Sequence, residues 1–206
     1  MKEDLDEHID HLIELMDSVP VGGKITLLTG SNGSGKSLIR KQIAFKIGEK
    51  IGVEARKAVA STSMEKRTSS NPEWGGLSGA MMDTAWMPTS NQTLGQIEGL
   101  LKIDDKYLVI DEPEIGMGEE TVMALVDFLN DKFKALGDKV PGVMIISHNR
   151  YIVEHLNYDC FLNTDGIKTK EEWLGRKLVP TDLKMLDENP LFFVIRDREK
   201  KAKEEK

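Results

Sequence analysis

A glycine-rich segment, GSNGSGKS at residues 30–37, restricts the fold of this chain more than any other feature of the sequence. It matches the pattern G-x-x-x-x-G-K-[ST] in full. The apolar run KITLLT precedes it, and KSLIRKQIAFKIGEKIG, a run with helical spacing, overlaps its end. In this context the pattern predicts a buried strand, a tightly curved loop and a helix, with the backbone N–H groups of the loop directed at a phosphate group.

The residue types of this loop fit nucleotide binding. Gly33 and Gly35 allow the backbone to curl so that its N–H groups converge, and the N-terminus of the following helix adds partial positive charge. Lys36 can place its ammonium group on the β and γ phosphates, and Ser37 can offer its hydroxyl group to Mg²⁺. An ordinary strand–helix turn is the alternative. Nucleotide contacts are expected from Gly30, Ser31, Asn32, Gly33, Ser34, Gly35, Lys36, Ser37 and Leu38.

Two consecutive acidic residues follow at the end of a second apolar run, YLVIDE at residues 107–112. A strand that ends in Asp111 delivers this carboxylate to the C-terminal edge of a parallel sheet, where open sheets bind ligands. We expect Asp111 to hold Mg²⁺ through a water molecule, and Glu112 to polarise the water that attacks the γ phosphate. Incidental acids in a turn are the alternative.

A third apolar run, GVMIISH at residues 142–148, ends in Ser147 and His148. An imidazole at this place can donate a hydrogen bond to the γ phosphate and respond to its loss. We therefore group His148 with Glu112 and Lys36 as the predicted catalytic residues. A purely structural histidine is the alternative.

The rest of the sequence alternates between strand-like and helix-like runs. Further strands are expected at residues 53–62 and 160–163, and further helices at residues 5–16, 92–102, 121–136 and 150–156. This alternation predicts an α/β fold, a P-loop NTPase with a mostly parallel sheet flanked by helices. We expect a single P-loop ATPase domain over residues 1–196, with a loop or small subdomain insertion at residues 63–89, and a charged tail at residues 197–206.

Composition limits the partners and the location of the protein. The chain has 28 Lys and Arg against 35 Asp and Glu, a net charge of −7. This charge does not support nucleic-acid binding, although a local basic patch stays compatible with it. No apolar run approaches the roughly 18 to 20 residues that cross a bilayer, so direct membrane insertion is not expected. The single cysteine, Cys160, fits a reducing cytoplasm and is expected to be a buried structural thiol.

The motifs GSNGSGKS, VIDEPE and IISHN, in this order, resemble those of the ABC-type ATPase superfamily, and most of all its soluble branch with the SMC, RecF and OLD-like ATPases. The resemblance extends over residues 24–156. It implies an ABC-ATPase-like fold, Mg²⁺-dependent hydrolysis of ATP, and a pair of subunits that enclose ATP, as a homodimer or in an assembly with another protein. It also implies Mg²⁺ at Ser37 and Asp111, the catalytic carboxylate at Glu112 and a switch role for His148.

The chain departs from this family in the signature sequence, which is LSGGQ-like and begins a helix shortly before the acidic motif. LSGA at residues 77–80 has similar letters but lies too far upstream of Asp111. The segment TSNQ at residues 89–92 has better spacing, and Ser90 would serve as the N-cap of the following helix. Ser90 is therefore the preferred candidate for a contact with ATP bound to a second subunit. A simple capped helix is the alternative.

Four other polar side chains have a structural and a functional interpretation, and the structural one is preferred. His8 and His11 are expected to be solvated or capping rather than metal ligands, because no further ligand accompanies them. Lys66 and Arg67 are expected to be surface charges, with a phosphate contact as the alternative.

The leading interpretation is a soluble ATPase subunit that converts ATP and water to ADP and phosphate. One alternative is an ATP-gated binding module with little turnover, which clamps a partner protein or a nucleic acid. A small-molecule kinase is a weaker alternative, since the strand that ends in His148 argues against it. A GTPase is disfavoured because the guanine-reading motif N-K-x-D does not occur in the sequence.

Overall fold

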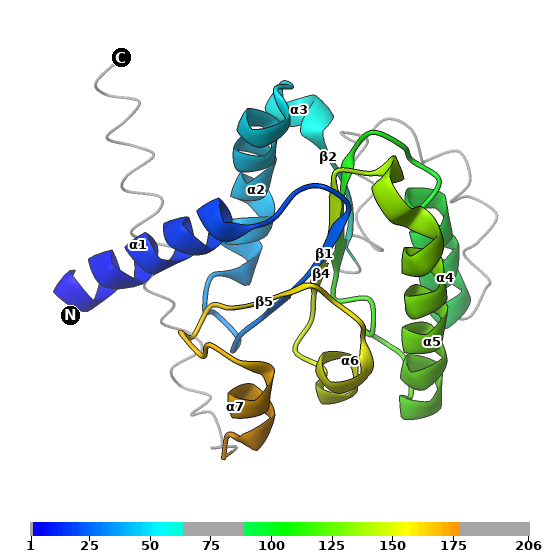
Figure 1. Ribbon diagram of the computed structural model, residues 1–206. Coiled ribbons are helices and arrows are strands. Elements are labelled where there is room, and N and C mark those ends of the chain that lie inside the picture. The colour runs from blue at the N-terminus through cyan, green and yellow to red at the C-terminus, as the bar shows by residue number, and fades with distance from the viewer. Residues whose placement is uncertain (1, 64–88, 178–206) are drawn as a thin grey trace.

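The chain has an α/β fold built on one parallel sheet (Figure 1). The computed structural model describes residues 2–63 and 89–177. The sheet has five strands in the order β2-β3-β4-β1-β5, and each neighbouring pair is parallel. The strands are β1 (Lys24–Thr29), β2 (Val59–Ser63), β3 (Tyr107–Asp111), β4 (Gly142–Ile146) and β5 (Cys160–Asn163). The predicted fold class, a mostly parallel sheet flanked by helices, is confirmed.

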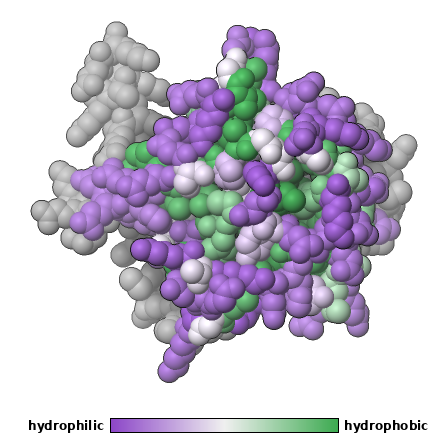
Figure 2. Space-filling view, in the orientation of Figure 1, coloured by the Kyte–Doolittle hydropathy of each residue, from purple (hydrophilic) through white to green (hydrophobic). Residues whose placement is uncertain are grey.

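Helices cover both faces of the sheet. Figure 1 shows α1 and α2 on one side of it and α4 and α5 on the other. In the view of Figure 2, hydrophilic residues cover much of the outer surface of α1 and α5, as expected for helices that bury one apolar stripe. The helices are α1 (Lys2–Ser18), α2 (Lys36–Ile51), α3 (Ala55–Ala58), α4 (Thr89–Leu100), α5 (Glu119–Leu136), the 3-10 turn η2 (Gly137–Lys139), α6 (Arg150–His155) and α7 (Lys170–Gly175).

Each face of the sheet has its own hydrophobic core, because successive residues of a strand point to opposite sides. Leu27 of β1 packs among side chains of α4, α5, α6 and α7, and its neighbour Leu28 packs among side chains of α1 and α2. Both leucines are fully buried. Burial on both faces explains why the strands read as continuous apolar runs.

Helix α2 places its apolar stripe as the sequence predicts. Ile39, Ile43 and Ile47 are fully buried, and they pack against Leu12 of α1. Leu38, which the helical pattern also places inward, is only partly buried. The helix that begins at the glycine-rich loop is therefore held from outside by α1.

Three local predictions were wrong. The strand expected at residues 53–62 begins only at Val59, because the helix-forming residues Ala55–Ala58 make the single turn α3. Ser90 does not precede its helix as an N-cap, since α4 already begins at Thr89. Cys160 is only half-buried, because it begins β5 at the edge of the sheet.

Several predicted features lie outside the described residues. These are almost all of the insertion at residues 63–89, which includes LSGA, Lys66 and Arg67, and the tail at residues 197–206. The division into one domain over residues 1–196 stays a prediction. Among the helices that the structure describes, none is both long and apolar enough to cross a membrane.

Candidate nucleotide-binding site

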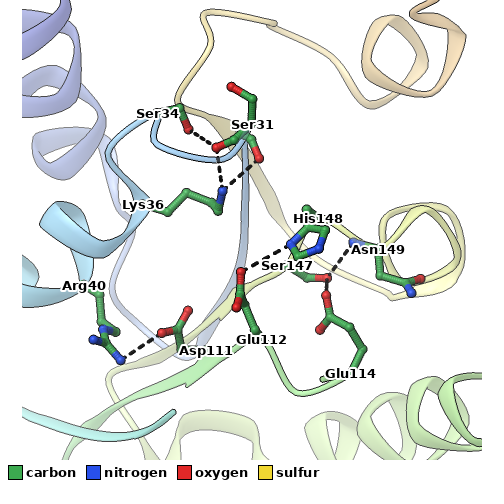
Figure 3. Close-up of polar contacts among 11 residues, drawn as sticks. Ser31, Ser34, Lys36, Arg40, Asp111, Glu112, Glu114, Ser147, His148 and Asn149 are labelled. Carbon is green, nitrogen blue, oxygen red and sulfur yellow. Dashed lines mark hydrogen bonds and ion pairs between the residues drawn. The ribbon is translucent and has the colours of Figure 1, made fainter. Parts of the chain in front are cut away.

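The three sequence motifs meet at one edge of the sheet, at the carboxyl ends of β1, β3 and β4 (Figure 3). Strand β4 lies between the other two, and its Ile146 pairs with Leu28 of β1 on one side and with Asp111 of β3 on the other. The glycine-rich loop at residues 30–37 follows β1, and we call it the P-loop. His148, which follows β4, therefore lies between the P-loop and the acidic pair.

Lys36 turns back into the P-loop (Figure 3). Its Nζ atom donates hydrogen bonds to the backbone carbonyls of Gly30 at 2.9 Å and Ser31 at 2.7 Å. The residue is buried, and this burial lowers the pKa of its ammonium group, while the carboxylates of Glu112 and Asp165 oppose the shift. The lysine thus closes the loop on itself and brings positive charge to the centre of the site.

The glycines of the P-loop serve its backbone shape and also its neighbours. Gly33 and Gly35 have φ angles of +79° and +104°, which side chains other than glycine rarely adopt. A Cβ atom at Gly35 would lie 2.5 Å from Leu12 Cδ1, and one at Gly30 would lie 1.8 Å from Thr164 Oγ1. Gly30 and Gly35 therefore leave space for the side chains of Thr164 and Leu12.

The segment after β5 holds the outer side of the P-loop. The Asp165 carboxylate accepts hydrogen bonds from the Ser31 backbone N–H and from the Ser31 hydroxyl, both at 2.7 Å. The Thr164 hydroxyl contacts the hydroxyl of Ser34. Sequence reasoning missed both residues. They reach the P-loop through the parallel pairing of β5 with β1, which brings the residues after each strand to the same edge and which local sequence patterns do not display.

Helix α1 holds the P-loop from a further side. His8 Nε2 donates a hydrogen bond to the Ser34 carbonyl at 3.0 Å, and His11 Nε2 donates one to the Asn163 carbonyl at 3.2 Å. The prediction of solvated or capping histidines was therefore wrong for both. Residues 152 positions apart in the chain meet in the second contact, so no local pattern could have shown it.

Asp111, the predicted metal ligand, forms an ion pair with Arg40 of α2. The distance between Arg40 Nη1 and Asp111 Oδ2 is 2.9 Å, and the two side chains are only 13% and 10% exposed. Arg40 follows Ser37 by three residues, which places both on one side of α2 near the sheet edge. Sequence reasoning did not single out this arginine.

Glu112 and His148, two of the predicted catalytic residues, contact each other. His148 Nδ1 lies 3.3 Å from Glu112 Oε1. This hydrogen bond lowers the pKa of the Glu112 carboxyl group and raises the pKa of the His148 imidazole. Glu112 also has a φ angle of +48°, which is uncommon for a residue with a side chain. The pair favours a carboxylate beside an imidazolium group.

A buried third acid, Glu114, supports the turn that carries the histidine. Ser147 Oγ donates a hydrogen bond to Glu114 Oε1 at 2.5 Å and accepts one from the Asn149 backbone N–H at 3.0 Å. Burial raises the pKa of the Glu114 carboxyl group. Within the described part of the chain, Glu114 Oε2 is buried without a hydrogen-bond partner. Sequence reasoning overlooked Glu114, although it lies in the quoted motif VIDEPE.

The donor and acceptor groups of this edge fit a nucleotide with a divalent cation. Lys36 uses two of its three N–H groups on loop carbonyls, so a third can reach an anion. Among the residues that the structure describes, no group of three or more His, Cys, Asp or Glu side chains could hold a metal ion. Ser37 and Asp111, the residues predicted to hold Mg²⁺, could bind the ion together with phosphate oxygens, which is its usual mode of binding in proteins.

Comparisons with known proteins leave the family open. No protein-family model matches the chain, and none of the curated proteins does. Among solved structures, C. elegans PCH-2 is similar with 16% identity and a TM-score of 0.35, over 78% of this chain and 41% of that chain. Domain III of the Thermotoga maritima replication initiation protein DnaA is similar with 15% identity and a TM-score of 0.41, over 74% of this chain and 58% of that chain.

The chain thus spans less than two thirds of the length of each of these two structures. Similarities this weak support no conclusion about activity. The loop pattern at residues 30–37, its position between β1 and α2, and the parallel sheet describe a P-loop NTPase fold.

Proposed function

We propose that this protein binds Mg²⁺ and ATP at the P-loop and hydrolyses the ATP, as an ABC-like ATPase. The observation that carries the proposal is the contact of Glu112 with His148 at the sheet edge that also carries Lys36. In the sheet, β4 lies next to β1, and β3 lies on the other side of β4. The last phosphate group of a triphosphate bound over the P-loop would therefore be directed at the carboxylate of Glu112, which follows β3. The kinase alternative has no comparable support.

The proposed roles follow from the charge of each group. The P-loop N–H groups and Lys36 bind phosphate oxygens, and Ser37 and Asp111 hold Mg²⁺, which would neutralise charge on the phosphates. Glu112 has a lowered pKa, so it is a carboxylate at neutral pH and can accept a hydrogen bond from the attacking water. The His148 imidazolium, with its raised pKa, can donate a hydrogen bond to a phosphate oxygen.

The assembly belongs to the proposal as well. The family resemblance implies that the site is completed by a second subunit, which would be another copy of this chain or a different protein. Its contribution would come through a contact such as that predicted for Ser90, in the first turn of α4. A cytoplasmic location is part of the same expectation.

The Glu112→Gln variant tests this function. Glutamine keeps the size of the side chain but cannot act as a general base, so the rate of phosphate release from ATP should fall about 100-fold or more. Binding of a fluorescent ATP analogue should stay close to that of the unchanged protein. The control is Glu120→Gln, which removes an equal charge from an exposed position of α5. Wild-type turnover in the Glu112→Gln variant would refute the assignment.

A second candidate function, an ATP-gated binding module with little turnover, is favoured by one observation. Glu112 already accepts a hydrogen bond from His148, and a carboxylate in such a pair is a weaker base. Light scattering after size-exclusion chromatography can separate the two functions. ATP-dependent dimers without measurable phosphate release would favour the binding module, whereas steady release would favour the ATPase.

A further inference from the structure

The ion pair between Arg40 and Asp111 is unlike the surface ion pairs of this protein. Its side chains are 13% and 10% exposed, against 53% and 40% in the pair of Lys24 with Asp159. A buried carboxylate needs a compensating charge, since removal from water penalises the ionised form. Arg40 supplies this charge in the protein without nucleotide.

The same carboxylate is the proposed ligand of Mg²⁺, through a water molecule. An arginine stays protonated at all physiological pH values, so its charge next to Asp111 does not disappear. Whether the guanidinium group moves away or keeps its place, it repels a second cation at this carboxylate, and the repulsion is strong where water is scarce. In addition, no ready-made cluster of acidic or histidine ligands among the described residues offsets this repulsion.

We propose that Arg40 is the resident counter-ion of Asp111 and makes divalent-cation binding conditional on nucleotide. The inference rests on the proposed binding of Mg²⁺ and nucleotide at the P-loop. Without nucleotide, Arg40 neutralises Asp111 and the cation finds little net negative charge. A bound triphosphate adds several negative charges beside Ser37, and these outweigh the arginine. The metal then binds together with the nucleotide and not before it.

The variant Arg40→Met tests this proposal, because methionine has a long apolar side chain, favours helices and carries no charge. Binding of Mn²⁺ to the protein without nucleotide is measured by electron paramagnetic resonance, and the Mg²⁺ concentration that half-saturates the tightening of fluorescent-nucleotide binding is measured by titration. We expect Arg40→Met to bind Mn²⁺ more tightly without nucleotide, and to need about tenfold less Mg²⁺ for half-saturation.

Two further variants make the test specific. Lys41→Met removes the same charge from an exposed neighbouring position of α2 and should leave both readouts unchanged. Arg40→Lys keeps the charge and should stay close to the unchanged protein, and it remains informative if Arg40→Met fails to fold. In that case Arg40→Lys would be compared with Arg40→Gln, which is expected to give the result stated above for Arg40→Met.

The outcomes separate the inference from the proposed function. Unchanged or weaker Mn²⁺ binding in the neutral variants would overturn the role of Arg40, whatever the protein does with ATP. Failure of every form to bind nucleotide in the presence of Mg²⁺ would instead refute the proposed function, and the Mn²⁺ measurement without nucleotide would still test Arg40. Equal effects of Lys41→Met and Arg40→Met would show a general charge effect and contradict the proposal.

Discussion

Replacing Gly30 by alanine should destabilise this protein even in the absence of nucleotide. A Cβ atom at this position would lie 1.8 Å from Thr164 Oγ1 and 2.7 Å from Ser34 Oγ. Thr164 is fully buried, and its hydroxyl group also donates to the Thr29 carbonyl at 3.3 Å, so it cannot move aside without loss. Extra atoms in a filled site cost about 1–3 kcal/mol, and this severe overlap places Gly30→Ala near the upper end of that range.

A second substitution identifies the cause. Thr164→Ala removes the atom that Gly30→Ala would overlap, and by itself it should cost about 1 kcal/mol for the lost hydrogen bonds. In the double variant the 1.8 Å overlap with Thr164 Oγ1 is gone, and only the milder approach of 2.7 Å to Ser34 Oγ remains. The loss of stability of the double variant should therefore be about 1–2 kcal/mol smaller than the sum of the two single losses. Such coupling would show that this P-loop glycine makes room for the segment after β5.

The assay is urea-induced unfolding without nucleotide, followed by far-ultraviolet circular dichroism. Gly95→Ala is the matched control, because a Cβ atom at this position of α4 would meet no atom within 4 Å. It should stabilise the protein by about 0.5–1 kcal/mol through helix propensity. Additive losses for Gly30→Ala and Thr164→Ala, or a neutral Gly30→Ala, would refute the steric reasoning.

The remaining predictions concern three histidine contacts. His8→Ala and His11→Ala should each lower the free energy of unfolding by about 1 kcal/mol, because each removes one hydrogen bond. Only His8→Ala should also weaken the binding of a fluorescent nucleotide, since only His8 donates to the P-loop. Equal nucleotide affinities of the two variants would contradict this role of His8. The Glu112–His148 pair should stabilise the fold only between the lowered pKa of Glu112 (ordinary value 4.5) and the raised pKa of His148 (ordinary value 6.5), since the carboxylate is lost below this window and the imidazolium above it. The His148 side chain is 46% exposed, so water screens the pair. Glu112→Gln should therefore lower the free energy of unfolding by about 0.5 kcal/mol at pH 6 and by less at pH 9. A loss of stability that does not depend on pH would contradict the ion pair.

Local sequence patterns predicted most of the strands and helices of the fold. The run YLVID predicts β3 to the residue, because strands buried on both faces leave an unbroken apolar signal. The prediction of a strand was wrong at residues 55–58, where alanine and basic side chains favour a helix over a strand and the chain forms α3. The predicted N-cap at Ser90 was wrong by two residues, which is within the usual uncertainty of a helix end, since α4 begins at Thr89.

A residue of the candidate site could be predicted only where a local sequence motif marks that residue. Lys36, Asp111, Glu112 and His148 were named from their positions at strand ends, and the parallel order of β1, β4 and β3 brings those ends together. Their roles in catalysis stay predictions. The partners of these side chains could not be named, because a contact such as that of Asp111 with Arg40 joins residues far apart in the chain.

By itself, the sequence predicted a glycine-rich loop with the phosphate-binding pattern between a strand and a helix, acidic side chains at the end of a second strand and a histidine shortly after a third. These features depend on residue type and on neighbours within a few positions, which a sequence displays directly. Tertiary structure alone decided what surrounds the loop: His8 from α1 and Asp165 from the segment after β5 hold its backbone, and Arg40 neutralises the proposed metal ligand. The physical reason is that such contacts depend on how the helices pack on the sheet and on the order of its strands.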